Sequence, residues 1–133
     1  MSLFQFPVRV YYEDTDAGGV VYHARYLHFY ERARTEFLRM LGFSQQDLLN
    51  TRNIAFVVKS MNIDYRSAAK LDDSLAVETR VSEIRGATIL FSQTLKRDEV
   101  ILNTATVKVA CVDLGKMKAV PIPSELRAAF ANK

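Results

Sequence analysis

Four runs of alternating side chains, joined by short polar links, constrain the fold of this chain more than any other feature. After residue 54, apolar side chains recur at every second position, with a few polar exceptions such as Lys59, Gln93 and Asn103. A period of two is the pattern of a strand that buries one face. Short links join antiparallel neighbours, because parallel strands need a long crossover. We therefore predict an antiparallel sheet with strands at residues 57–65, 75–81, 87–95 and 101–111, joined by turns at 71–73, 85–86 and 97–99.

The first twenty residues predict a strand followed by a loop. Residues 4–12 alternate between apolar and polar side chains, with Tyr12 on the apolar face. This alternation is typical of a half-buried strand. Residues 13–20 interrupt it with three acidic side chains and two glycines, a composition that is typical of a loop.

One long helix is predicted between this loop and the sheet. Residues 24–41 carry apolar side chains at helical spacing, which predicts a deeply buried amphipathic helix. The stripe consists of Tyr26, Tyr30, Ala33, Phe37 and Met40 or Leu41, and it is widened by Leu27, Phe29 and Leu38.

Two short helices are also predicted. Ser44 and Asp47 resemble a capping pair for a helix that ends near Asn50. Two prolines end the strand region, and Ser124 then caps a helix that runs through Phe130.

This order of elements indicates the α+β class. One apolar helix accompanies one antiparallel sheet, and no repeat or linker divides the chain. We therefore predict a single domain over residues 1–133. A sheet with one main helix either curls around that helix or meets a partner at its open edge. A homo-oligomer is the natural expectation.

Composition excludes several classes of protein. The 133 residues are 49% hydrophobic and 25% charged, with a net charge of +3, which is typical of a soluble globular chain. No apolar run approaches the ~18 residues of a membrane span, and residues 1–7 lack the pattern of a secretory signal. The single cysteine, Cys111, forms no internal disulfide. We expect a cytoplasmic protein without a nucleic-acid partner, because no Lys/Arg block or nucleic-acid-binding motif is present.

Acidic residues gather between the first strand and the long helix, in a chain that is otherwise slightly basic. One interpretation is a solvated turn in which Asp14 or Asp16 accepts local backbone hydrogen bonds. The other is a carboxylate beside the N-terminus of a buried helix, where free backbone N–H groups polarise a carbonyl oxygen. Gly18 and Gly19 would then let a ligand approach the backbone closely. Such a site suits acyl transfer, and spacing alone leaves both interpretations open.

Other kinds of site are disfavoured. The Gly-Gly pair is followed by no Gly-Lys-Ser/Thr, and a dinucleotide-binding fingerprint is absent. His23 and His28 would lie roughly 140° apart around a helix of ~3.6 residues per turn, so no shared metal is expected. Cys111 lies on the apolar face of a predicted strand, where a core thiol is the simpler interpretation. No serine occupies a Gly-x-Ser-x-Gly elbow.

The run from Tyr12 to Tyr26, Tyr-Glu-Asp-Thr-Asp-Ala-Gly-Gly-Val-Val-Tyr-His-Ala-Arg-Tyr, continues into Phe-Tyr-Glu-Arg-Ala-Arg at residues 29–34. It resembles the signature of hotdog-fold acyl-CoA thioesterases of the 4-hydroxybenzoyl-CoA thioesterase family. The resemblance is stronger to the bacterial subfamily encoded with the Tol-Pal cell-envelope system, and it covers nearly the whole chain. Ala17 stands where relatives often carry proline. Further matching segments lie at residues 55–58, 71–73, 112–113 and 116–118.

The resemblance implies a hotdog fold, in which an antiparallel sheet wraps around one long central helix. It also implies dimers that join their sheets edge to edge, often paired into tetramers, with the pocket between subunits. Asp16 matches the catalytic carboxylate, and the backbone N–H of His23 matches the oxyanion donor. No metal or cofactor is implied. Asp16 would either attack the thioester carbonyl or activate a water molecule.

The implied substrate is a short-chain or aliphatic acyl-CoA. Gly18, Gly19, Val20 and Tyr22 fall where the acyl group would dock. The phosphates of coenzyme A need cations. Lys59 and Arg85 are the candidates, and the alternative for each is an ordinary surface charge.

Three alternatives stay open. The His23 imidazole could act as a general acid. The chain could be a non-catalytic scaffold that binds acyl-CoA or acyl carrier protein at the inner membrane, where its positive charge would suit an acidic carrier. A dehydratase of the same fold is a weaker third alternative, because such enzymes arrange His and carboxylate differently.

Overall fold

The computed structural model describes residues 3–131, and the outermost two residues at each end, which belong to the predicted domain, lie outside this range. The elements in chain order are β1 (Phe4–Arg9), the 3₁₀ turn η1 (Tyr12–Asp14), α1 (Arg25–Met40), α2 (Gln45–Arg52), β2 (Ile54–Tyr65), β3 (Ser74–Arg85), β4 (Thr88–Arg97), β5 (Val100–Asp113), β6 (Lys118–Ala119) and α3 (Ser124–Ala131).

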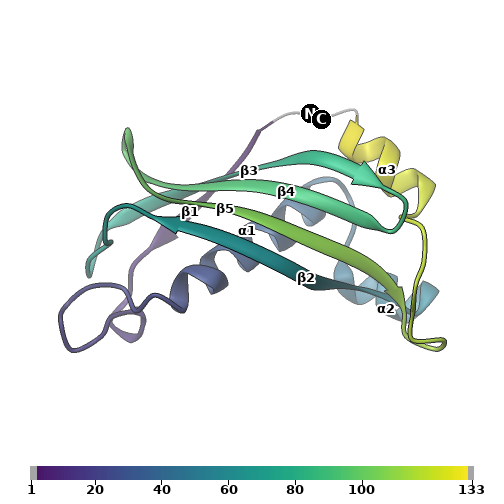
Figure 1. Ribbon diagram of the computed structural model, residues 1–133, viewed down its shortest axis with the longest axis horizontal. Helices are drawn as coiled ribbons and strands as arrows, with labels where there is room; N and C mark the ends of the chain where they lie inside the picture. Colours follow the sequence, from purple (N-terminus) through teal and green to yellow (C-terminus); the bar gives the residue numbers. More distant parts are fainter. Residues whose placement is uncertain (1–2, 132–133) are drawn as a thin grey trace.

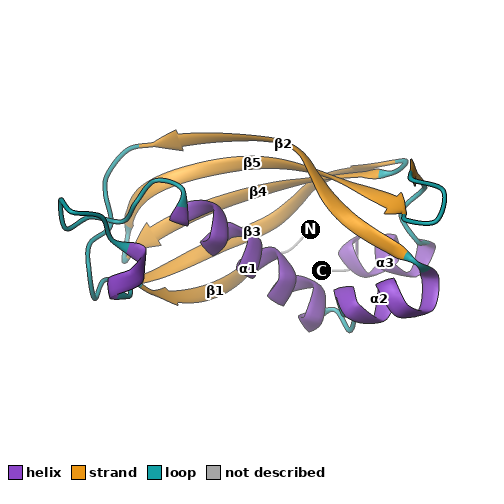
Figure 2. Cartoon of the chain, turned by 90° about the horizontal axis from the view of Figure 1, so that it is seen from below, coloured by secondary structure: helices purple, strands orange, loops and turns teal. Residues whose placement is uncertain are grey.

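One antiparallel sheet curls around α1. Its strand order is β1-β3-β4-β5-β2, and the short β6 pairs with β5. Helix α1 lies along the concave side, while α2 and α3 sit at one end (Figures 1 and 2). The predicted α+β class and the wrapping of the sheet around one long helix are confirmed. The two-residue strand β6 was not predicted, because so short a segment carries no period.

The apolar stripe of α1 fills the hollow of the sheet. Tyr26, Tyr30, Ala33 and Phe37 are all buried, as predicted. The Phe37 ring stacks on Phe4 at a centroid distance of 5.2 Å and meets Phe130 edge-on at 5.5 Å. This one side chain therefore joins β1, α1 and α3.

The predicted stripe is too wide at Leu27, and its last member is Leu41, which packs against the core, rather than Met40, which is 49% exposed. Leu27 is 41% exposed rather than buried. It follows Tyr26 by one residue, a rotation of about 100° around the helix, and so leaves the face that meets the sheet.

A row of buried polar side chains lies between α1 and the sheet. Gln93 donates from Nε2 to the Tyr30 carbonyl and to Thr79 Oγ1, both at 3.0 Å. Arg34 donates to Gln93 Oε1 at 2.9 Å, and the Tyr30 hydroxyl donates to Asn103 Oδ1. Burial raises the pKa of the Tyr30 phenol, so it remains a donor. These bonds explain why the apolar faces of β4 and β5 contain polar residues.

Strand β1 is shorter than predicted. It ends at Arg9, although Val10 is still buried and exchanges backbone hydrogen bonds with the 72–73 turn. The chain then enters η1, where Tyr12 is 83% exposed. The prediction that Tyr12 continues the buried face is wrong, because the 3₁₀ turn breaks the period of two.

A bulge in β2 reverses the predicted face of its first half. The pairing with β5 shifts between Val58 and Ser60, which leaves Lys59 outside the ladder. Phe56 and Val58 pair with the inward-facing Cys111 and Val109 and border the hollow beside α1, so they face inward, whereas Val57 faces outward. Both valines are nevertheless exposed, Val57 at 43% and Val58 at 49%. The predicted common face of Val57, Lys59 and Met61 is therefore wrong.

The helix boundaries stay close to prediction, whereas β2 begins at Ile54 rather than residue 57, and β3 continues past a bulge after Val81 to Arg85. Ser44 Oγ accepts from the Asp47 N–H at 3.2 Å, which confirms the capping pair. Helix α2 ends at Arg52 rather than near Asn50, because Asn53 takes the left-handed conformation with φ 55°.

Replacing Phe37 by alanine is expected to destabilise the fold strongly. Removing a buried phenylalanine costs about 3–5 kcal/mol of unfolding free energy. Met40→Ala, on the same helix but 49% exposed, is the control and should change stability by less than about 0.5 kcal/mol. Chemical denaturation measures both, and equal midpoints for the two variants would contradict the packing described.

Candidate active site

The loop between β1 and α1 lies at the end of the sheet opposite α2 and α3 (Figure 1). Its two arms are bridged, since Thr15 pairs with Val21 and the Asp16 N–H donates to the Val20 carbonyl at 2.9 Å. Val20 also bridges to Lys70 in the segment between β2 and β3. The loop is therefore a closed, braced turn.

Asp16 stands at the tip of this loop and is exposed. Its Oδ1 accepts the Gly18 N–H at 2.8 Å. A Cβ on Gly18 would lie 3.2 Å from that oxygen, and Gly19 has φ +82°, which L side chains rarely adopt. The local turn predicted for Asp16 is present. Its backbone favours glycine at position 19, whereas a side chain at position 18 would require the Asp16 carboxylate to shift slightly.

His23 provides a backbone donor just before α1. Within residues 3–131 no acceptor takes its N–H, and the N-cap residue Ala24 supplies no side-chain cap. Its carbonyl accepts from the Tyr65 hydroxyl at 3.4 Å, and the Tyr22 ring lies 4.6 Å from its imidazole. A free N–H at the start of a 16-residue helix can donate to a carbonyl oxygen that gains negative charge.

Asp14 differs from its acidic neighbours because it is buried, at 4% exposure. Its carboxylate accepts the Tyr11 N–H at 2.9 Å and Arg25 Nε at 3.0 Å. The sequence pattern predicts the same turn role for Asp14 and Asp16. It does not reveal Arg25, eleven positions away on the helix, as the partner of Asp14.

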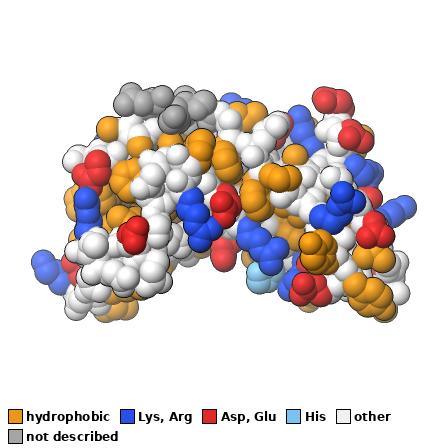
Figure 3. All heavy atoms as spheres, turned by 180° about the vertical axis from the view of Figure 1, so that it is seen from behind, with side chains coloured by type: hydrophobic (Ala, Val, Ile, Leu, Met, Phe, Trp, Pro, Cys, Tyr) orange, Lys and Arg blue, Asp and Glu red, His pale blue; other side chains and the backbone are white. Residues whose placement is uncertain are grey.

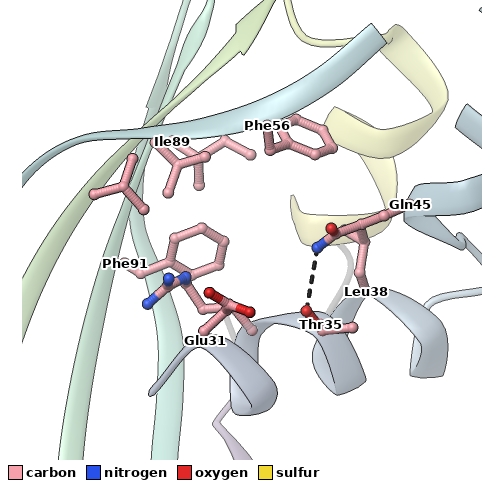
Figure 4. Close-up of a pocket in the computed structure, with 10 residues that line it drawn as sticks. Glu31, Thr35, Leu38, Gln45, Phe56, Ile89 and Phe91 are labelled. Carbon is pink, nitrogen blue, oxygen red and sulfur yellow. Dashed lines mark hydrogen bonds between the residues drawn. The ribbon is translucent and has the colours of Figure 1, made fainter. Parts of the chain in front are cut away.

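A cavity of about 240 Å³ lies between α1, α2 and the concave side of the sheet. Figure 4 shows Phe56, Ile89 and Phe91 facing it from the sheet, and Glu31, Thr35 and Leu38 facing it from α1. Gln45 closes one side by donating to Thr35 Oγ1 at 3.2 Å. Arg34, Val58 and Val109 complete the lining. The cavity could not be predicted from the sequence, because its walls come from five separate elements, α1, α2, β2, β4 and β5.

Within one chain the cavity and Asp16 are far apart. The α1 residues that line the cavity begin at Glu31 and end at Leu38. At ~1.5 Å per residue they lie roughly 12–22 Å beyond His23 along the helix. Asp16 lines neither this cavity nor the three other surface hollows described among residues 3–131.

The two predicted phosphate-binding cations also lie away from the loop. Lys59 is exposed on the β2 bulge. Arg85 pairs with Glu83 at 3.0 Å and precedes Gly86, whose carbonyl accepts from Ile122 beside α3. From the α1 side, Lys and Arg are interspersed with Asp and Glu rather than forming one basic field (Figure 3). One chain therefore does not bring Lys59 or Arg85 to Asp16.

The part of the chain that the structure describes contains neither a cluster of metal ligands nor a membrane-spanning helix. No three His, Cys, Asp or Glu side chains come together there as a metal site would require. None of the helices in residues 3–131 combines the length and apolar character needed to cross a membrane.

Residues 10–130 match the model of a protein family described as the thioesterase-like superfamily. The chain is 71% identical to the acyl-CoA thioesterase YbgC of Haemophilus influenzae over 127 residues, which cover 96% of this chain and 93% of that protein. It is 52% identical to the acyl-CoA thioester hydrolase YbgC of Escherichia coli O6:H1 over 130 residues, with 97% and 96% coverage.

Solved structures share the fold. A probable thioesterase from Bartonella henselae superposes with a TM-score of 0.88 at 39% identity, over 92% of this chain and all of that one. A 1,4-dihydroxy-2-naphthoyl-CoA thioesterase from Synechocystis superposes with a TM-score of 0.91 over 98% and 97% of the chains, and at 23% identity this likeness concerns the fold alone.

The chain belongs to the thioesterase-like superfamily. The predicted hotdog fold and the predicted enzyme class, a thioesterase, are confirmed. The role of each predicted site residue remains a prediction.

Cys111 is expected to be inert in the folded protein. It is fully buried, and burial raises the pKa of its thiol, whereas the thiolate is the reactive form. Alkylation at neutral pH should be slow until denaturant is added, and Cys111→Ala should retain turnover. Mass spectrometry and a thiol-release assay measure these outcomes, and a folded Cys111→Ala protein without activity would contradict them.

Proposed function

We propose that the chain hydrolyses acyl-CoA to the free acid and coenzyme A, with Asp16 as the reacting carboxylate. One observation carries the proposal: a single braced loop holds an exposed carboxylate at its tip and an unpaired backbone N–H, that of His23, where α1 begins. The acyl-CoA thioesterases among the relatives support the substrate class.

Hydrolysis of a thioester needs few groups from the protein, here one backbone donor and one carboxylate. The thioester oxygen accepts the His23 N–H, and this donor stabilises the negative charge that develops there. Asp16 either attacks the carbonyl carbon to form a mixed anhydride or removes a proton from the attacking water. If Asp16 attacks, the C–S bond breaks as the anhydride forms, and water then hydrolyses the anhydride to the free acid and restores the carboxylate. If water attacks, the C–S bond breaks directly to give the free acid. Both routes release a thiolate. Because a thiol has a pKa of about 8.5, no general acid is required for this step.

A second copy of the chain is proposed to complete the site. Strand β2 ends the sheet, and within the described residues its outer edge pairs with no other strand. Val57, Val58 and Tyr65 on β2 are 43–49% exposed. An unpaired, partly apolar edge of twelve residues is a template for pairing with another strand.

Pairing through a two-fold axis would bring the cavity and the loop together. In each chain β2 begins at Ile54, next to α2, and ends at Tyr65, which contacts His23. Two antiparallel copies of β2 place the Tyr65 end of one beside the Ile54 end of the other. Asp16 of one copy would then approach the cavity of its partner, whose wall of Phe56, Ile89 and Phe91 suits an aliphatic acyl group, while Glu31 and Arg34 also line it. Lys59 and Arg85 could bind phosphates only in such an assembly.

Asp16→Asn is expected to lower kcat about a hundredfold to ten-thousandfold, the contribution typical of a general base. Asp113→Asn is the matched control, because Asp113 Oδ1 likewise accepts the N–H of the glycine two residues later, at 2.9 Å. Thiol release from a series of acyl-CoAs measures both variants. Wild-type turnover by Asp16→Asn would remove the proposed chemistry.

Val57→Asp is expected to convert an oligomer into monomers and to reduce activity together with assembly. A carboxylate on the outer face of an edge strand opposes pairing with an identical strand. Val100→Asp places the same charge at a residue that is 50% exposed where β5 begins, and should leave both properties unchanged. Light scattering and thiol release are the measurements, and a fully active Val57→Asp monomer would exclude a shared site.

A binding module is the second candidate, favoured by the exposure of Asp16 and the distance of the cavity in one chain. Such a module would bind acyl-CoA or acyl carrier protein in the cytoplasm or at the inner membrane, without releasing thiol. Equal binding by wild type and Asp16→Asn, with no thiol release by either, would favour it. His23→Ala tests the imidazole, since full turnover would assign the role of His23 to its backbone alone.

A further inference from the structure

We infer that Asp14 is a positioning residue that sets the geometry between Asp16 and the His23 N–H. The inference rests on the proposed function, because it concerns the same loop. Asp14 is 4% exposed, and both of its carboxylate oxygens are engaged, Oδ2 by the Tyr11 N–H and Oδ1 by Arg25. The surface hollow that it lines with Arg9 and Arg32 is separate from the cavity at α2. It therefore acts through other residues rather than on the substrate.

The first group of contacts ties down the start of the loop. Asp14 Oδ2 accepts the Tyr11 N–H at 2.9 Å, so the carboxylate closes the 3₁₀ turn on itself. Asp16 follows two residues later, separated from this closed turn by Thr15 alone, and Thr15 is itself bridged to Val21. The position of the Asp16 backbone is thus determined by the turn that Asp14 closes.

The second group ties down the end of the loop. The Asp14 carbonyl accepts the Tyr22 N–H at 2.9 Å, one residue before His23. Asp14 Oδ1 accepts Arg25 Nε at 3.0 Å, two residues after His23, and Arg25 is the first residue of α1. The His23 N–H is therefore flanked on both sides by residues bonded to Asp14.

The carboxylate charge matters as well as its shape. Arg25 Nη2 lies 3.0 Å from Asp14 Oδ1 and 3.4 Å from Oε2 of the exposed Glu13, so Asp14 is the buried partner of this cation. An asparagine would keep one acceptor oxygen and present an NH₂ group to the Tyr11 N–H or to Arg25. It cannot satisfy both donors, so one of the two side-chain bonds would be lost, while the backbone bond from the Tyr22 N–H to the carbonyl of residue 14 would remain.

Loss of this clamp is expected to lower kcat and to leave KM unchanged. Misplacing a reacting group by ~1 Å can cost about a hundredfold in rate, whereas acyl-CoA would still bind in the cavity. Asp14→Asn should therefore lose about tenfold to a hundredfold in kcat. Arg25→Met, which keeps the side-chain stem without its donors, should show the same loss. Since both variants break the same interaction, the one between Asp14 and Arg25, the double variant should be no slower than the slower single variant.

The experiment compares these variants with Asp16→Asn and with Glu13→Gln. Glu13 also contacts Arg25, but at 3.4 Å and from a side chain that is 71% exposed, and it does not bond to Tyr11, so Glu13→Gln should retain wild-type kcat. Thiol release from butyryl-, hexanoyl- and octanoyl-CoA gives kcat and KM, measured well below the unfolding temperature of each variant. Arg25→Met tests the clamp independently if Asp14→Asn fails to fold.

The outcomes separate this inference from the proposed function. Reduced kcat at constant KM in Asp14→Asn and Arg25→Met, without additivity, supports the clamp. Wild-type kcat in these variants, or a raised KM at constant kcat, overturns it when Asp16→Asn is inactive. Wild-type turnover by Asp16→Asn overturns the proposed function, and the positioning role with it.

Discussion

The position of α1 in the hollow of the sheet determines where everything else in this molecule can lie. Apolar packing of Tyr26 and Phe37 holds the helix against the strands, but apolar contacts alone tolerate sliding and rotation. The hydrogen bonds from Gln93 to the Tyr30 carbonyl and from the Tyr30 hydroxyl to Asn103 are directional. They select one height and one rotation, because any other would leave buried polar groups without partners.

A helix held in this way presents its N-terminus at a defined point, and the loop before it uses that point. The closed loop places the Asp16 carboxylate and the His23 N–H at one end of the sheet, while the cavity opens toward the other end. The two features belong to one reaction only if a second copy reverses the direction of β2. The proposed thioesterase is therefore inseparable from the proposed edge-to-edge assembly.

Much of this arrangement could be predicted from residues alone. The helix, the long strands and the turns follow from periods of two and 3.6 and from turn residues such as Gly86, which are local properties of the chain. The candidate loop was found because acidic side chains and two glycines precede a buried helix. The cavity was not predictable, since Arg34, Gln45, Phe56 and Phe91 share no sequence pattern. The difference between Asp14 and Asp16 was not predictable either. Their side chains are identical, but Asp16 accepts the Gly18 N–H at 2.8 Å and Asp14 accepts Arg25 Nε at 3.0 Å.

By itself, then, the sequence determined the class of fold, the order of its elements, the family and the segment that carries the proposed chemistry. Only the tertiary structure decided which side chains of that segment are buried, which face of β2 points inward and where a cavity forms. The physical reason is that periodicity is a property of one segment, whereas burial and strand register depend on two. The bulge at Lys59 exists only in the pairing of β2 with β5, and the burial of Asp14 only in its contact with Arg25.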